Sequence, residues 1–281
     1  MKVVTDIHAL PAAVDALSAR GGLALVPTMG NIHQGHLSLV ELAMQQARAV
    51  AVSLFINPTQ FNDTADYENY PRTLEEDLEQ LRSVGAHLIF APRGDAMYPH
   101  GTDQPQVVVE PTHWAGSLEG AHRPGHFRGV ATVVTKLFNL FRPESAVFGR
   151  KDYQQLRVVQ ALVRELFMPI RIVEAPIVRE SDGLAMSSRN RRLSSPDRQL
   201  APRLYRVLRA LADELRRGNR DLQAMEAAAC EELHTNRFDV DYVTVRRPDL
   251  GVPDGTEERL VVLGAATLGG TRLIDNVVTD D

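Results

Sequence analysis

The sequence predicts an α/β protein, with a parallel-sheet domain over residues 1–176 and a smaller α+β domain over residues 177–281. A chain of 281 residues is long enough for about two domains. In the first domain, continuous apolar runs such as 50–56 alternate with segments of helical apolar spacing. Strands that are apolar on both faces need cover on both sides, which is typical of a parallel sheet between helices.

Strand-like runs and helical segments alternate through the first domain. Ligands of parallel sheets bind beyond the carboxyl ends of the strands, so the loops that follow these strands are the candidate site. We expect the domain boundary near Pro176, which interrupts the last run. The expected strands are 23–26, 50–56, 87–91, 146–148 and 170–178, and the expected helices are 35–49, 73–84, 127–141 and 154–167.

The second domain has a different pattern, in which helices precede strands. Ser195 is expected to cap a long helix that begins at Pro196 and ends near Arg217, where Gly218 stops it. A further helix should follow, and then an all-strand segment. These elements are expected at about 221–235 for the helix and at 240–245, 259–263 and 271–275 for the strands.

Charge and composition exclude several function classes. The net charge of −5 gives no electrostatic reason to expect nucleic acid or an acidic membrane as a partner. Cys230 is the only cysteine, so neither an intramolecular disulfide nor a cysteine-based metal cage can form. The N-terminus has no long apolar core, and no run reaches about 18 apolar residues. We therefore expect a soluble cytoplasmic protein.

Two histidines stand where the first strand passes into a helix, within residues 27–36. A helix N-terminus presents N–H groups and the positive end of the helix dipole, which suit phosphate. Gly30 and Gly35 let the backbone approach a ligand closely. His33 and His36 can hydrogen-bond phosphoryl oxygens as charge grows on them during transfer. The alternative is a pair of surface histidines in an ordinary loop.

Amide side chains follow the second strand. Pro58 fixes a turn and biases Asn57 away from helix, so that Asn57 and Gln60 offer donors and acceptors on the ligand side of the sheet. The alternative is a simple turn whose amides are solvated.

Cationic side chains occur at two further loops. Lys151 follows a strand and opens a helix, so it can reach nucleotide phosphates as a point charge, with Asp152 orienting it or capping the helix. Arg123 and His126 lie in a basic turn before a helix and could hold an anionic group. The alternatives are a solvated lysine and an ordinary N-terminal turn.

Residues 183–192 follow the last strand of the first domain and carry Ser187, Ser188 and Arg189. Hydroxyl groups, guanidinium charge and loop N–H groups together make a phosphate clamp. Loops of this kind often close over substrates. The alternative is a polar, mobile loop between domains.

Acidic residues gather near the start of the helix expected at 73–84, where carboxylates favour the helix dipole. This structural interpretation competes with a metal site. Mg²⁺ takes about one or two carboxylates in addition to phosphates, so Glu76 and Asp77 are candidate ligands.

These segments occur in the order found in the pantothenate synthetase (pantoate–β-alanine ligase) family, and the chain resembles that family over nearly its whole length. The His-x-Gly-His element alone marks only the wider nucleotidylyltransferase superfamily. Arg150 stands where the family commonly has Glu, which changes the charge beside Lys151, and we expect the Arg150 side chain to point away. The matching segments are 27–36, 57–61, 70–73, 123–129, 149–155, 187–190 and 273–276.

The resemblance implies a Rossmann-like first domain, a C-terminal lid domain and a homodimer. It also implies a reaction in two steps. Pantoate attacks the α-phosphorus of ATP to give pantoyl adenylate and pyrophosphate, and β-alanine then displaces AMP to give pantothenate. Mg²⁺ would bridge the ATP phosphates near Asp77 and Glu76.

The resemblance also implies roles for individual residues. His36, His33, Lys151 and Arg189 would act on the phosphates during catalysis. Pantoate would be bound by Gln60 and Gln155 with support from Asn57, and Arg123 and His126 are further candidates for substrate binding. The nucleotide site would comprise Met29, Gly30, His33, His36, Gly149, Lys151, Asp152, Val178, Met186, Ser187, Ser188 and Arg189.

Two rival functions remain open. A nucleotidylyltransferase with a phosphate-bearing acceptor should need more cations for that acceptor than the neutral amides Asn57, Gln60 and Gln155 provide. A regulatory or RNA-binding nucleotide module would bind ATP without turnover, but the charge of −5 and an aromatic content of 6% weaken its RNA version. Pantoate-dependent release of pyrophosphate separates the prediction from both.

Overall fold

The structure is a computed structural model that describes residues 1–102 and 105–280. The chain divides into two compact units. The first comprises Met1–Arg150 and Gln154–Pro176, and the second comprises Lys151–Tyr153 and Ile177–Asp281. Each unit has its own apolar core, so each is described by itself.

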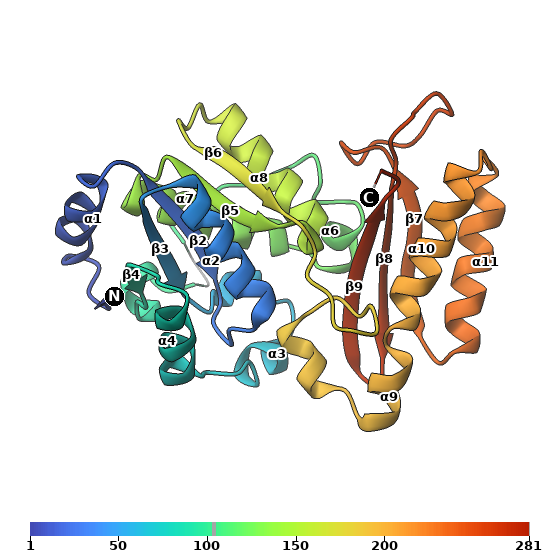
Figure 1. Ribbon diagram of the computed structural model, residues 1–281, viewed down its shortest axis with the longest axis horizontal. Helices are drawn as coiled ribbons and strands as arrows, with labels where there is room; N and C mark the ends of the chain where they lie inside the picture. Colours follow the sequence, from blue (N-terminus) through green and yellow to red (C-terminus); the bar gives the residue numbers. More distant parts are fainter. Residues whose placement is uncertain (103–104, 281) are drawn as a thin grey trace. The chain divides into compact units, whose positions relative to one another are not determined.

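The first unit is built on a six-stranded sheet in the order β1-β4-β3-β2-β5-β6. Every paired neighbour in this sheet runs parallel (Figure 1). The predicted fold class, a Rossmann-like parallel sheet domain followed by a smaller α+β domain, is confirmed. The strands are β1 Lys2–Val4, β2 Leu23–Thr28, β3 Ala49–Leu54, β4 Leu88–Phe90, β5 Ser145–Gly149 and β6 Arg171–Ala175.

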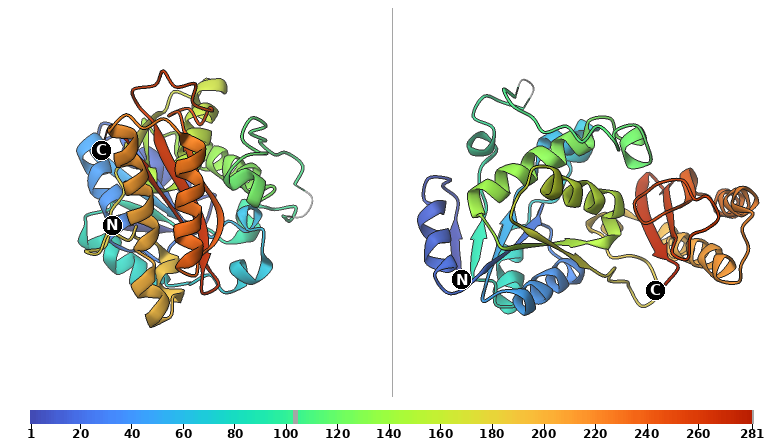
Figure 2. Two further views of the ribbon diagram at one scale, coloured as in Figure 1. Left: turned by 90° about the vertical axis from the view of Figure 1, so that its right-hand side faces the viewer. Right: turned by 90° about the horizontal axis from the view of Figure 1, so that it is seen from above.

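Helices cover both faces of this sheet (Figure 2). Successive residues of a strand point to opposite faces, so Leu25 packs in the core beneath α1, α7 and α8, and Val26 in the core beneath α2 and α4. This burial on both faces explains the continuous apolar runs. The helices are α1 Leu10–Ser18, α2 Gln34–Gln46, α3 Thr64–Glu68, α4 Leu74–Ser83, α5 Gly94–Met97, α6 Glu119–His122, α7 His126–Phe141 and α8 Tyr153–Glu165.

One helix boundary was predicted wrongly. The helix expected over 35–49 ends at Gln46, and Ala47 is already extended. Ala49 instead pairs with Leu23 at the start of β3. The apolar spacing of the helix runs into an apolar strand, and periodicity alone does not separate the two.

The order of the strands creates a switch point between β2 and β5. From β2 the chain moves outward through β3 to β4, whereas β5 and β6 are added on the other side of β2. Connections therefore leave the carboxyl ends of β2 and β5 in opposite directions. Open α/β sheets bind ligands at a switch point of this kind, beyond the carboxyl ends of the strands.

The second unit contains a three-stranded antiparallel sheet in the order β7-β8-β9, covered by α10 and α11. Its core includes Leu208, Leu211 and Val262. The elements are α9 Ser195–Leu200, α10 Arg203–Arg216, α11 Leu222–Thr235, β7 Asp239–Arg246, β8 Val261–Leu268 and β9 Thr271–Val278.

The long helix predicted from Ser195 to about Arg217 is two helices, α9 and α10, that meet at Pro202. Proline has no N–H and its ring clashes with the preceding turn, so it ends one helix and starts the next. The cap is also one residue earlier than expected, because the Ser194 side chain accepts the hydrogen bond from the Asp197 N–H.

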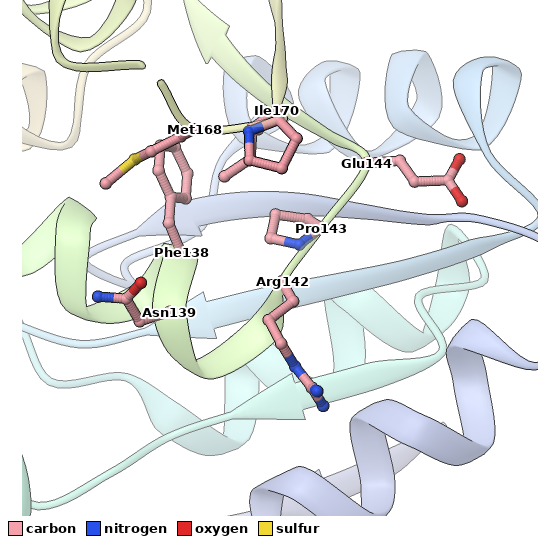
Figure 3. A pocket seen from close by; sticks show the side chains of 8 residues that line it. Phe138, Asn139, Arg142, Pro143, Glu144, Met168 and Ile170 are labelled. Carbon is pink, nitrogen blue, oxygen red and sulfur yellow. The ribbon is translucent and has the colours of Figure 1, made fainter. Parts of the chain in front are cut away.

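A cavity of about 340 Å³ lies at the amino end of β5 (Figure 3). Phe138, Met168 and Ile170 contribute its apolar lining. Loops at this end precede the strands, so the cavity is at the opposite end of the sheet from the predicted site. No helix in the described part of the chain is both long and apolar enough to span a membrane.

Candidate active site

The loop after β2 is held in a tight, left-handed path. Gly30 and Asn31 have φ values of 80° and 51°, which glycine adopts freely and asparagine tolerates. The Asp77 carboxylate accepts hydrogen bonds from the Asn31 N–H at 2.9 Å and the Ile32 N–H at 2.7 Å. Thr73 donates a third, at 3.1 Å. Asp77 therefore anchors the backbone just before His33.

Gly30 also makes room for this anchor. A Cβ atom at Gly30 would lie 2.9 Å from Asp77 Oδ2. Both the positive φ and the close carboxylate thus require glycine at this position.

His33 is the N-cap residue of α2, and its ring takes part in the cap. The His33 Nδ1 atom accepts a hydrogen bond from the Gly35 N–H at 3.1 Å. An accepting Nδ1 carries no proton, so the neutral ring has its proton on Nε2, where it can donate to a ligand. His36 lies one turn on, with its ring centroid 4.0 Å from that of His33. The predicted pair is therefore a pair in space, at the start of a helix.

The amides predicted after β3 form one buried network. Asn57 is 1% exposed and Gln60 is 9% exposed. Asn57 Nδ2 donates to Gln60 Oε1 at 3.0 Å and to the Gly129 carbonyl oxygen at 3.1 Å. Gln60 Nε2 points at Met29 Sδ, 3.1 Å away. These contacts connect the β3 loop to the β2 loop and to α7.

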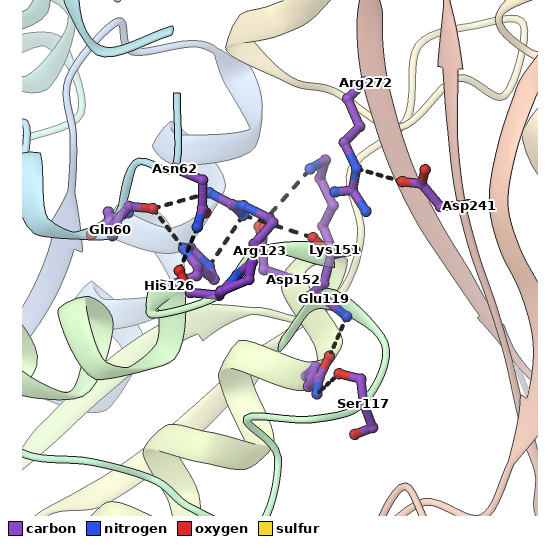
Figure 4. A network of polar contacts seen from close by, with 12 residues as sticks. Gln60, Asn62, Ser117, Glu119, Arg123, His126, Lys151, Asp152, Asp241 and Arg272 are labelled. Atoms are coloured by element: carbon purple, nitrogen blue, oxygen red, sulfur yellow. Dashed lines mark hydrogen bonds and ion pairs between the residues drawn. The ribbon is translucent and has the colours of Figure 1, made fainter. Parts of the chain in front are cut away.

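Arg123 and His126 bind the backbone of Gln60 (Figure 4). His126 Nδ1 lies 2.8 Å from the Gln60 carbonyl oxygen, which can only accept, so Nδ1 carries the proton. His126 Nε2 is then an acceptor for Arg123, 3.1 Å away. Arg123 also reaches the Gln60 carbonyl, at 3.3 Å. Both residues predicted to bind substrate thus hold Gln60.

The end of β5 and the start of α8 carry Gly149, Arg150 and Gln155, which were singled out from the sequence. Arg150, which replaces the Glu common in the resembling family, forms an ion pair with Glu174 on β6 at 3.7 Å. Gly149 ends β5, and Gln155 is half-buried on α8. The adjacent Gln154 is buried and holds the loop before α6 through hydrogen bonds to Ser117 and Glu119.

In the second unit, the segment that carries Lys151 is attached to β9. Asn276 Nδ2 donates to the Lys151 carbonyl oxygen at 3.1 Å, and Lys151 Nζ lies 3.9 Å from Asp152. Next to Asn276, the Asp275 carboxylate accepts hydrogen bonds from both terminal nitrogens of the Arg179 guanidinium, at 2.6 and 3.1 Å. Burial raises the pKa of the Asp275 carboxyl, and the pairing with Arg179 opposes that rise.

The same Arg179 organises the segment predicted as a phosphate clamp. It donates to the Gly183 carbonyl, and its guanidinium stacks on Tyr205, 3.7 Å from the ring centroid. The Met186 N–H donates to the Val178 carbonyl oxygen at 3.0 Å, which closes the segment into a turn. Ser187 then caps a short 3-10 helix, Ser188–Arg192, by accepting from the Arg189 N–H.

The predicted metal ligands do not build a protein cage. Both Asp77 oxygens accept hydrogen bonds from the β2 loop or Thr73, whereas Glu76 is exposed. Within residues 1–102 and 105–280, no group of three His, Cys, Asp or Glu side chains is placed to hold a metal ion. The donor set fits an ion carried mainly by phosphate and water oxygens, which is how Mg²⁺ commonly binds with nucleotides.

In each unit, residues that hold the candidate site residues in place were not predicted from the sequence. Tyr98 and Gly129 hold Asn57, Thr73 assists Asp77, and Arg179 supports the second unit's loop. Each reaches its partner through the folded chain, so no local pattern marks the contact, although Thr73 and Gly129 lie in the matching segments 70–73 and 123–129. Gly129 left one further signal, a glycine inside the helix expected over 127–141.

Comparison with known proteins agrees with the geometry. A family model described as pantoate-beta-alanine ligase matches residues 2–278. A pantothenate synthetase from Halorhodospira halophila is 50% identical, with 99% of this chain and 98% of that protein covered. One from Stutzerimonas stutzeri is 48% identical, covering 100% and 98%.

Solved structures give the same answer. Pantothenate synthetase from Thermus thermophilus has a TM-score of 0.90 at 43% identity, with 99% of each chain covered. Pantoate-beta-alanine ligase from Francisella tularensis, complexed with beta-gamma ATP and beta-alanine, has a TM-score of 0.84 at 32% identity, covering 100% of this chain and 98% of that one. With its fold, its paired histidines and its full-length matches, the chain belongs to the pantoate–β-alanine ligase family.

Proposed function

We propose that this chain joins pantoate to β-alanine through a pantoyl adenylate that forms from ATP. ATP-dependent ligation itself follows from membership of the family. The observation that carries the residue-level proposal is the pair His33 and His36 at the start of α2, in the loop that Asp77 anchors. The Francisella relative, solved with an ATP compound and beta-alanine, supports the same substrates.

The chemistry needs an activated carboxylate. A carboxylate and an amine form a salt at neutral pH, so the oxygen of pantoate must first receive a leaving group. Its attack on the α-phosphorus breaks the bond to the β-phosphate and releases pyrophosphate. The amine of β-alanine then attacks the carbonyl carbon, AMP leaves with the carboxyl oxygen, and the nitrogen loses a proton.

The protein's part in the first step is to position reactants and neutralise charge. His33 Nε2–H and His36 are proposed as donors to the phosphates, next to the N–H groups of the first turn of α2. Lys151 and Arg189 are proposed to bind the departing pyrophosphate. Further nucleotide contacts are proposed for Met29, Gly30, Gly149, Asp152, Val178, Met186, Ser187 and Ser188.

Pantoate is proposed to bind Gln60 and Gln155, whose neutral amides suit hydroxyl and carboxylate groups. Asn57, Arg123 and His126 support Gln60 through its side chain and its carbonyl. Glu76 is proposed as a carboxylate that would hold Mg²⁺, which would neutralise charge on the ATP phosphates when bound. Asp77 is chiefly committed to the loop. A cytoplasmic homodimer is the proposed working state.

A pyrophosphate-release assay tests the function. With ATP, Mg²⁺ and pantoate, we expect pyrophosphate release that stops when pantoate is omitted. When β-alanine is added, AMP and pantothenate should form continuously. Nicotinamide mononucleotide and phosphopantetheine are the control acceptors. ATP binding without pantoate-dependent release, or release with a phosphate-bearing acceptor instead, would contradict the proposal.

Replacing Gln60 should affect the acid substrate and not the nucleotide. In Gln60→Ala, pantoate loses a positioned amide partner, which costs roughly 1–3 kcal/mol in a buried polar site. Pantoate affinity should therefore fall about five- to a hundredfold, while ATP affinity changes little. Calorimetry with each ligand measures both, and an equal loss for the two ligands would refute this division.

A further inference from the structure

We infer that the Gly129 carbonyl, acting through Asn57, fixes which end of the Gln60 amide faces the acid substrate, and so makes the site select a carboxylate over a carboxamide. Asn57 is then a positioning residue for specificity. The inference rests on the proposed function, because it assumes that Gln60 meets the acid substrate. It begins from the directions of the hydrogen bonds among these three residues.

The Gly129 carbonyl determines the orientation of Asn57. A carbonyl oxygen only accepts hydrogen bonds, so the group of Asn57 that lies 3.1 Å from it must be the NH₂ group. In the opposite orientation, two oxygen atoms would face each other in a buried site. The carbonyl group of Gly129 in α7 thus determines the orientation of the Asn57 side chain in the β3 loop.

Two hydroxyl groups stabilise the same orientation from the other side. Asn57 Oδ1 accepts from the Tyr98 hydroxyl at 2.8 Å and from the Thr59 hydroxyl at 3.0 Å. Burial raises the pKa of the Tyr98 hydroxyl, and the neighbouring Thr59 hydroxyl lowers it by less, so Tyr98 keeps its proton at neutral pH. Since a hydroxyl can also accept, these contacts reinforce the orientation that Gly129 determines.

Asn57 in turn orients Gln60. Its NH₂ group lies 3.0 Å from Gln60 Oε1, which can only accept. Turning the Gln60 amide over would place two NH₂ groups against each other. Gln60 Nε2 is therefore directed away from Asn57 and toward Met29 Sδ, which is a weak acceptor. A ligand oxygen that replaces the sulfur as the partner would gain a stronger hydrogen bond.

The backbone around Gln60 leaves little freedom for a different arrangement. Its carbonyl oxygen is bound by His126 and Arg123. A Cβ atom at Gly129 would lie 2.3 Å from the Thr59 carbonyl oxygen and 2.8 Å from the Gln60 backbone nitrogen. Only glycine therefore lets α7 come this close to the turn. Main chain and side chain of Gln60 are thus both fixed before a substrate arrives.

The consequence is a chemical filter. Gln60 offers N–H donors, so the ligand atom beside it must be an acceptor, such as a carboxylate or hydroxyl oxygen. A carboxamide can bind only with its oxygen toward Gln60, which forces its NH₂ group into the place where a carboxylate has its second oxygen. Rejection of that kind rests on a mismatched polar group, and it is stronger than rejection by size alone.

Asn57→Asp is the variant that should reverse the filter. The new carboxylate still accepts from Tyr98 and Thr59, but it has no N–H to offer Gln60 Oε1 or the Gly129 carbonyl oxygen, so the turn also loses stability, which the melting temperature reports. Gln60 should then turn its NH₂ group toward the new carboxylate at position 57 and present Oε1 to the ligand. We expect pantoate affinity to fall about 10- to 100-fold, the scale of one mismatched polar contact, and affinity for the primary amide of pantoate to fall less than about threefold.

Asn57→Ala is the matched control, because it removes the contact without reversing it. Gln60 can still turn to suit either ligand, so both affinities should fall by similar factors. Calorimetry with pantoate and its primary amide gives the ratio for each variant. If Asn57→Asp loses both ligands equally, or keeps the wild-type ratio, the proposed filter is wrong.

A measurement on the unaltered protein covers the case in which Asn57→Asp does not fold. With the Asn and Gln side-chain amides labelled with ¹⁵N, the Gln60 NH₂ protons should show an NOE to the Met29 methyl group. NOEs from the Gln60 NH₂ protons to those of Asn57, without one to Met29, would overturn the inference. This readout needs no substrate, so it separates failure of the filter from failure of the proposed function, which would appear as wild-type protein that does not bind pantoate.

Discussion

His36→Ala should fold normally and lose at least about a hundredfold in the rate of adenylate formation, the usual scale for removing one preorganised transition-state donor. His36 lies in the first turn of α2 with its ring against that of His33, where charge on the phosphates would grow during transfer. Its side chain is only half-buried, so the loss of packing should cost little stability. Rapid-quench measurement of pantoyl adenylate under single-turnover conditions reports the step directly.

The matched control is His8→Ala, which removes an exposed histidine of the same unit. Its single-turnover rate and melting temperature should both stay near the wild-type values. A near-normal rate of adenylate formation in His36→Ala would remove His36 from the transition state. A melting temperature far below that of the control would instead give it a structural role.

Asp77→Ala should impair both the fold and the first reaction step. The substitution leaves the buried N–H groups of Asn31 and Ile32 without their acceptor. Each unsatisfied buried group costs about 1–3 kcal/mol, so we expect the free energy of unfolding to fall by about 2–4 kcal/mol after partial relaxation of the loop. Because the same loop leads into His33 and His36, misplacement by about 1 Å should slow adenylation about a hundredfold.

The measurement is denaturant unfolding of the nucleotide-free protein, followed by the single-turnover assay at rising Mg²⁺ concentration. Glu79→Ala, an exposed carboxylate on the same helix, is the control and should change stability by less than about 0.5 kcal/mol. If Asp77 acts chiefly by binding metal, the variant will unfold like the control and added Mg²⁺ will restore its rate. Either result contradicts the anchoring role.

Local patterns predicted strands β2 to β6, helices α2, α4, α7 and α8, and the loops that carry chemistry, but they missed β1, α1 and the short helices α3, α5 and α6. The two histidines, the Asn57 turn and Lys151 could be found because each stands directly after an apolar run, and parallel topology brings such positions to one edge. The resemblance then attached roles to them, and the family is confirmed by the matches. The roles of the individual residues remain predictions.

The features that could not be predicted from the sequence depend on contacts between residues that are far apart in the chain. Nothing near Asp77 shows that its oxygens will meet N–H groups 45 and 46 positions earlier in the chain. Arg123 and His126 are predicted to bind an anionic group because they are cationic or polar and lie in a turn, and that role stays a prediction. The structure adds that both bind the peptide carbonyl of Gln60. Residue type predicted that they would meet an acceptor, and only the fold identifies which one.

Gly129 places a limit on engineering this protein for heat resistance. A glycine inside a helix disfavours that helix by about 0.5–1 kcal/mol relative to alanine, which makes it an obvious target in a search for stabilising changes. Here the missing methyl group is the space in which the Asn57–Gln60 turn meets α7. The sequence therefore gives up helix propensity at the position where the Asn57–Gln60 turn packs, and a library that optimises helices alone would disrupt that turn.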